Sequence, residues 1–240
     1  MSEEELESAK KEMEEILINE LINFVRDGAD PKSDKSAQMK CYNIVYNFTE
    51  KGFAENLLNY HNEKVTGITK EIYEKIKNLS GIDFIDSFIL YTERLNALFF
   101  HLSRIFLYIS FYYLKGCEDK NNVRKFDEDD ITEFSMQIYK ECMFDKLENK
   151  ILDALNESFA QEKINENMEC KEKIMKIMKI INDMDIIKPK IIKINEKSYG
   201  WKERNSNDKI KAHSGHFKKF EDFFKKIGLK LENHLKKIII

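Results

Sequence analysis

Cysteine and histidine, the residues that most often carry catalysis or bind metals, are thinly spread along this chain. The four cysteines lie far from one another in the sequence, at Cys41, Cys117, Cys142 and Cys170. None has the paired spacing of a zinc site or a disulfide framework. His213 and His216 are three residues apart in a polar stretch with no cysteine nearby, which does not predict a metal site.

Catalytic motifs are also missing from the sequence. It contains no glycine-rich phosphate loop, no His-Glu-x-x-His pair and no Gly-x-Ser-x-Gly turn. Cys142 has no local histidine, so we interpret it as a small buried apolar residue rather than a nucleophile. The sequence therefore favours a non-catalytic binding or scaffolding protein that uses no cofactor and no metal.

The most informative segment is a tyrosine-rich stretch at residues 39–48. With about 100° of rotation per residue, one helix face gathers four apolar residues: Cys41, Ile44, Val45 and Phe48. A second face gathers Met39, Tyr42 and Tyr46, roughly 130° away. One apolar stripe is enough to dock a helix on its own core, and aromatic side chains with polar tips favour protein–protein contacts. The alternative is a helix buried on both sides in a large bundle.

Composition places the chain among ordinary intracellular proteins. Its 240 residues suffice for one or two compact domains, with 35% charged and 42% hydrophobic residues. The net charge of −3 predicts no nucleic-acid or membrane partner overall. The acidic start lacks the basic and apolar regions of a signal peptide. We expect a reduced protein of the cytoplasm, the nucleus or both.

The pattern along the chain predicts an all-α fold. Only two prolines interrupt the sequence and no strand-like alternation of useful length occurs. Expected helices cover about 3–27, 34–52, 53–79, 82–114, 127–155 and 172–184. The apolar run at 98–114 is barely long enough to span a membrane, and Arg104 at its centre would cost about 2.5–3.5 kcal/mol there. A central helix buried by its neighbours is therefore the preferred interpretation.

The C-terminal stretch, residues 209–240, differs in character. It holds nine lysines and three acidic residues, a net charge of about +6, interleaved with phenylalanines. A basic amphipathic helix of this kind could bind anionic lipid or nucleic acid. The preferred interpretation is the start of a further packed unit whose lysines are solvated.

Four segments together suggest a family. Residues 42–49 resemble the Tyr-x-x-Val-Tyr-Asn-Tyr run in the second helix of cullins. Residues 105–114 are similar to the cullin Tyr-Leu-Asp-Arg-x-Tyr-Val segment, and residues 138–147 to Trp-Arg-Asp-x-Leu-Phe-x-x-Leu. Residues 217–224 resemble the Phe-Glu-x-x-Phe-Leu that opens the second cullin repeat. Their order and spacing match as well.

The resemblance implies a cullin-repeat-like five-helix bundle at residues 1–165 and a partial second repeat, or a basic helical tail, at 166–240. It implies a scaffold arm that binds a Skp- or BTB-fold adaptor in a cullin–RING ubiquitin ligase, for ubiquitin-dependent protein degradation. Adaptor contacts in that family come from the second and fifth helices. Carried over by position, they fall on Gln38, Met39, Tyr42, Tyr46, Ile131, Thr132 and Met136.

Departures from the family pattern affect this expectation. Ser110 and Phe111 replace the Asp-Arg pair, Tyr139 replaces the Trp, and Lys146 replaces a Pro. Gln38 and Thr132 stand where adaptor-contacting aromatics often occur, so affinity or adaptor choice is expected to differ. The chain also ends inside the second repeat, without the domain that recruits the RING subunit. No RING partner is expected from this chain alone.

Other functions remain open from the sequence. A truncated arm could occupy adaptors unproductively as a competitor. A generic helical interaction module would associate without adaptor selectivity. A membrane or nucleic-acid binder using the basic tail would bind in a strongly salt-dependent way.

Overall fold

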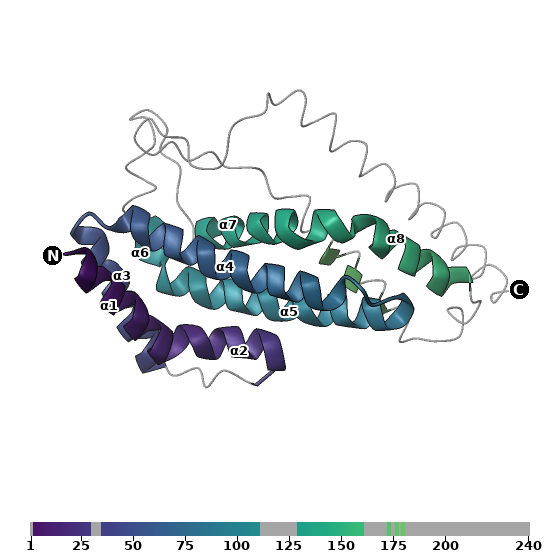
Figure 1. Cartoon of the computed structure of the whole chain (residues 1–240), viewed down its shortest axis with the longest axis horizontal. Helices are drawn as coiled ribbons and strands as arrows, with labels where there is room; N and C mark the ends of the chain where they lie inside the picture. Colours follow the sequence, from purple (N-terminus) through teal and green to yellow (C-terminus); the bar gives the residue numbers. More distant parts are fainter. Residues whose placement is uncertain are drawn as a thin grey trace, which may run out of the picture.

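The computed structural model describes residues 2–29, 35–110 and 129–160, together with 172–173, 176–177 and 179–180. All regular structure in these residues is helical (Figure 1), which confirms the all-α prediction. The helices with their bounds are α1 (Glu3–Met13), α2 (Asn19–Asp27), α3 (Lys35–Glu50), α4 (Ala54–Ile76), α5 (Gly81–Ile105), α6 (Leu107–Ile109), α7 (Asp129–Tyr139) and α8 (Asp145–Ala160). Two π-helical turns, Glu14–Ile18 and Lys140–Phe144, join α1 to α2 and α7 to α8.

Helix α5 is the centre of the bundle. It packs against α2, α3, α4, α7 and α8. In Figure 1, α4 and α5 run side by side with α7 and α8 along them, while α1, α2 and α3 gather at one end. Nine apolar residues of α5 are buried accordingly: Phe84, Ile85, Phe88, Ile89, Leu95, Leu98, Phe99, Leu102 and Ile105. The preferred interpretation of the apolar run as a central helix packed by its neighbours is confirmed up to Ile105, where α5 ends.

That run does not form one helix over its whole expected length. Phe106 leaves helical conformation, with φ −94° and ψ 9°, and separates α5 from α6. Its ring packs edge-on against His61 with 5.2 Å between centroids, so a tertiary contact within the core accompanies the break. The part at 111–114 lies outside the described residues. No helix in the described part of the chain is long and apolar enough to cross a membrane.

The end of α2 shows how local sequence and tertiary packing combine. Gly28 follows α2 with φ +77°, in the left-handed region that glycine tolerates best. The Arg94 guanidinium of α5 lies against it and donates a hydrogen bond to the Val25 carbonyl at 3.3 Å. A Cβ at Gly28 would lie 2.1 Å from Arg94 Nη2. The left-handed conformation therefore favours glycine there, and a Cβ would also displace the guanidinium of Arg94.

Two residues beyond α8 pack on the same bundle. Ile177 and Ile180 are buried and belong to the core that α1 to α8 share. The expected boundary at residue 165 lies outside the described residues and stays a prediction.

Candidate protein-docking surface

Helix α3 has one buried face and one exposed face, which is one of the two arrangements that its periodicity leaves open. Cys41, Val45 and Phe48 lie in the core, and burial raises the pKa of the Cys41 thiol to about 11. On the other side, Met39 is 58% exposed and Tyr46 is 40% exposed. The helix is therefore not enclosed on both sides.

We call Met39, Tyr42 and Tyr46 the α3 stripe. Tyr42 is half-buried at its edge. Gln38, one position earlier than Met39, is also half-buried, and its side-chain amide nitrogen has no hydrogen-bond partner among the described residues. Of the four α3 residues predicted to contact an adaptor, Met39 and Tyr46 are the most accessible.

The ring of Tyr46 is held in place from one side. It meets the Tyr108 ring of α6 edge-on, with centroids 4.5 Å apart and an interplanar angle of 62°. The Tyr108 hydroxyl donates a hydrogen bond to the Glu50 carboxylate at the end of α3. Aromatic pairs in this geometry are favourable beyond the area that they bury. Tyr46 is thus a fixed aromatic surface with an accessible face.

The charged residues of α3 before Glu50 are all basic. Lys35 and Lys40 are exposed on α3, and the helix has no acidic residue before Glu50. The carboxylate of Glu50 already accepts the hydrogen bond of Tyr108. An acidic partner surface would complement this charge.

The α7 residues predicted to contact an adaptor behave differently. Ile131 is 0% exposed, so its placement on an accessible adaptor surface is corrected: the side chain belongs to the core. Thr132 and Met136 are half-buried, and Met136 packs against the core from outside. The physical reason is that α7 packs against α4 and α5. Within the described residues, α3 and α7 are not a closely packed pair, since α3 lies against α1, α4, α5 and α6.

Sequence reasoning missed an exposed aromatic on α5. Phe100 is 48% exposed although it lies within the most apolar run of the chain. The guanidinium carbon of Arg104 lies 4.3 Å from the centre of its ring. The available signal was the spacing of four residues between aromatic and cation, which places both on one face of a helix.

One buried pair resembles a catalytic arrangement but is closed to substrate. His61 Nε2 lies 3.1 Å from the hydroxyl of Ser135, and its Nδ1 lies 3.0 Å from Asn62 Oδ1. Both His61 and Ser135 are buried. Burial lowers the pKa of His61 to about 4, with the Asn62 hydrogen bond acting in the opposite direction. The pair therefore ties α4 to α7 inside the core.

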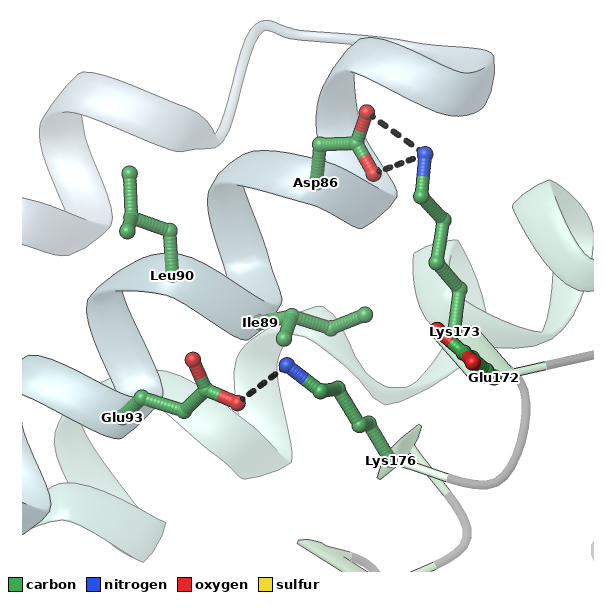
Figure 2. A pocket seen from close by; sticks show the side chains of 7 residues that line it. All are labelled: Asp86, Ile89, Leu90, Glu93, Glu172, Lys173 and Lys176. Atoms are coloured by element: carbon green, nitrogen blue, oxygen red, sulfur yellow. Dashed lines mark hydrogen bonds and ion pairs between the residues drawn. The ribbon is translucent and has the colours of Figure 1, made fainter. Parts of the chain in front are cut away.

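A hollow of about 260 Å³ lies beside α5, and Figure 2 shows its lining. Its walls are ion pairs within the chain: Lys173 Nζ lies 2.7 Å from Asp86, and Lys176 Nζ lies 2.7 Å from Glu93. The hydrogen bond and charge of Glu93 raise the pKa of Lys176. Four of the five charged side chains of this hollow therefore pair with one another, and Glu172 is the fifth.

Few other side chains of the described residues are of a type that binds metals or acts as a nucleophile. The described residues contain no group of three or more His, Cys, Asp or Glu able to hold a metal ion. Cys142 is half-buried against the core. The His213–His216 pair and the basic stretch at 209–240 lie outside the described residues.

Comparison with known proteins adds no relative. No family model matches the chain, and no curated protein sequence matches it either.

Proposed function

We propose that this chain is a non-catalytic helical scaffold that binds a partner protein through the α3 stripe. The observation that carries the proposal is the division of α3 into two faces. Cys41 and Val45 are completely buried on one side, whereas Met39 and Tyr46 face solvent on the other. Large apolar side chains, aromatic ones above all, are the usual centres of protein interfaces.

The partner class comes from the sequence resemblance. In that resemblance the α3 stripe matches the positions that contact the adaptor in cullins, so a Skp- or BTB-fold adaptor is the partner that we propose. The chain then acts as a cullin-like arm of a ubiquitin ligase, and it holds the adaptor at a fixed place. The all-helical bundle and the exposure of Met39 and Tyr46 support this function.

The corrected contact set is smaller than the sequence suggested. Ile131 leaves it because the side chain has no accessible surface. Gln38, Met39, Tyr42 and Tyr46 stay in the set, with Thr132 and Met136 as peripheral members.

A binding assay with purified adaptors of the Skp and BTB folds tests the proposal. We expect the unaltered chain to bind one of them and Tyr46→Ala to weaken that binding by about 2 kcal/mol, roughly thirtyfold. Ile82→Ala is the matched control, because Ile82 is 44% exposed in the first turn of α5, at the end of that helix farther from α6. Binding that is equal for the Tyr46 and Ile82 variants would contradict the role of the stripe, and so would no binding by the unaltered chain.

A further inference from the structure

Phe100 and Arg104 form a small exposed patch on the last turns of α5, which we call the Phe100–Arg104 patch. Phe100 keeps almost half of its surface in water, and Arg104 is also exposed. The guanidinium stacks over the ring with its carbon 4.3 Å from the ring centre. A cation held over an aromatic face in this way gains electrostatic attraction from the ring.

The stacked guanidinium is free to bind a carboxylate. No carboxylate of the described residues lies within ion-pair distance of Arg104. Stacking uses the flat face of the guanidinium and leaves the N–H groups at its edge available. Those groups match a carboxylate in geometry and charge, and the ring beside them offers an apolar contact.

The patch is connected to the α3 stripe through α6. Tyr108 follows Arg104 by four residues, and its ring contacts the ring of Tyr46 at 4.5 Å. Helix α3 packs against both α5 and α6. Helix α6 therefore links the two regions through the contact of Tyr108 with Tyr46. An interface of standard size covers about 800 Å² on each partner.

Charge identifies the chemistry of the occupant. Lys35 and Lys40 are exposed on α3, and Arg104 is exposed on α5. The charged residues of α3 and of the last turn of α5 are these three cations and Glu50, whose carboxylate accepts the hydrogen bond of Tyr108, although the whole chain has a net charge of −3. An acidic segment with apolar side chains complements these cations better than a basic or neutral one.

We infer that the Phe100–Arg104 patch is a second contact point for the partner bound by the α3 stripe. The partner places a carboxylate on Arg104 and an apolar side chain against Phe100. Arg104 is therefore a specificity-determining residue that favours adaptors with an acidic, apolar segment at this point. The inference rests on the proposed function, because the same partner occupies both regions.

Affinity measurements at low and at physiological salt test this contact. The probe is the purified Skp- or BTB-fold adaptor that the unaltered chain binds. We expect Arg104→Gln to weaken binding about tenfold at low salt and to reduce the dependence on salt. Arg104→Lys keeps the charge but loses the planar edge, and we expect an intermediate affinity. Phe100→Ala removes both the apolar contact and the support of the guanidinium, and we expect a loss at both salt concentrations.

Lys70→Gln is the matched control for charge. Lys70 is exposed on α4, and its replacement changes the net charge by the same amount. We expect its affinity and salt dependence to equal those of the unaltered chain. Thermal unfolding of each variant shows whether the fold is retained, and all four substitutions change exposed side chains.

The outcomes separate this inference from the function on which it rests. If Tyr46→Ala loses binding while Arg104→Gln and Phe100→Ala bind normally, the second contact is overturned and the α3 stripe stands. If Lys70→Gln weakens binding as much as Arg104→Gln, general charge explains the effect and the specific contact is overturned. If the unaltered chain binds no adaptor, both proposals fail.

Discussion

Helices α3 and α7 were both expected to offer side chains to the same partner, yet their predicted contact residues differ in exposure. Helix α3 lies at one end of the bundle (Figure 1). Met39 and Tyr46 of its second stripe are exposed. Helix α7 packs on both α4 and α5, and Ile131 is completely buried there. The comparison shows that helical periodicity identifies residues that share a face. Whether another helix covers that face depends on tertiary packing.

The largest expected effect on stability is that of a substitution at the buried Ile131 of α7. Ile131→Ala should lower the free energy of unfolding by about 2–5 kcal/mol, because it removes buried methyl groups and leaves a cavity. Ile82→Ala makes the same chemical change at a side chain that is 44% exposed. We expect that control to cost less than about 1 kcal/mol. Urea unfolding measures both, and equal costs would contradict the assignment of Ile131 to the core.

A hydroxyl deletion on each helix tests the comparison more finely. The Tyr139 hydroxyl of α7 is buried and lies 2.8 Å from the Thr92 hydroxyl of α5. Tyr139→Phe leaves Thr92 without its partner in the core, and we expect a loss of about 1–3 kcal/mol. Tyr46→Phe removes the same group from a side chain of α3 that is 40% exposed, so no buried partner is left unsatisfied. A stability loss in Tyr46→Phe as large as that in Tyr139→Phe would show that α3 is enclosed.

The junction of α4 and α7 should also make stability depend on pH. His61 is buried and neutral, and its pKa is lowered to about 4 from an ordinary 6.5. The unfolded chain therefore binds more protons than the folded one as the pH falls from 6.5 towards 4, and stability is lost over that range. Between pH 7.5 and 5.5 we expect a loss of about 1 kcal/mol.

His61→Gln is the variant for this measurement, because it removes the titrating group and keeps a polar side chain beside Ser135. Its unfolding free energy should change less between the two pH values than that of the unaltered chain. The pKa of His101 is also lowered, chiefly by burial and then by Arg104, so a smaller dependence of the same sign remains. Parallel pH profiles for the two proteins would show that His61 is not held neutral in the core.

The extent to which the sequence predicts this molecule follows from the same physics. The all-α class and the buried side of α3 follow from periodicity, since Cys41, Val45 and Phe48 recur at helical spacing. The break at Phe106 could not be predicted, because its ring packs on His61 from a helix more than 40 residues earlier. Phe100 was missed for a similar reason: an apolar run predicts burial of its members, but only packing shows which one stays outside.

The candidate site was predicted in part. Met39 and Tyr46 lie on the accessible face that the helical rotation indicated, whereas Ile131 was placed there only by the family resemblance. Positional transfer carries a residue's place in a motif and nothing about its burial in this chain. Arg104 is a residue whose role in the site only the structure indicates. In the sequence it is an argument against a membrane span, and in the structure it is an exposed group stacked on Phe100.

The smallest expected effect on stability is the one that separates an interface from a core. Met39 is 58% exposed, so Met39→Ala should change the free energy of unfolding by less than about 0.5 kcal/mol. The same substitution should weaken adaptor binding measurably, because a long apolar side chain at the centre of an interface loses its packing there. Urea unfolding and a binding titration on one preparation measure both quantities. A residue buried in the core would show a large change in unfolding, and an idle surface residue would show neither change. Only a docking residue combines unchanged folding with lost binding, and the opposite combination at Ile131 would complete the contrast between the two helices.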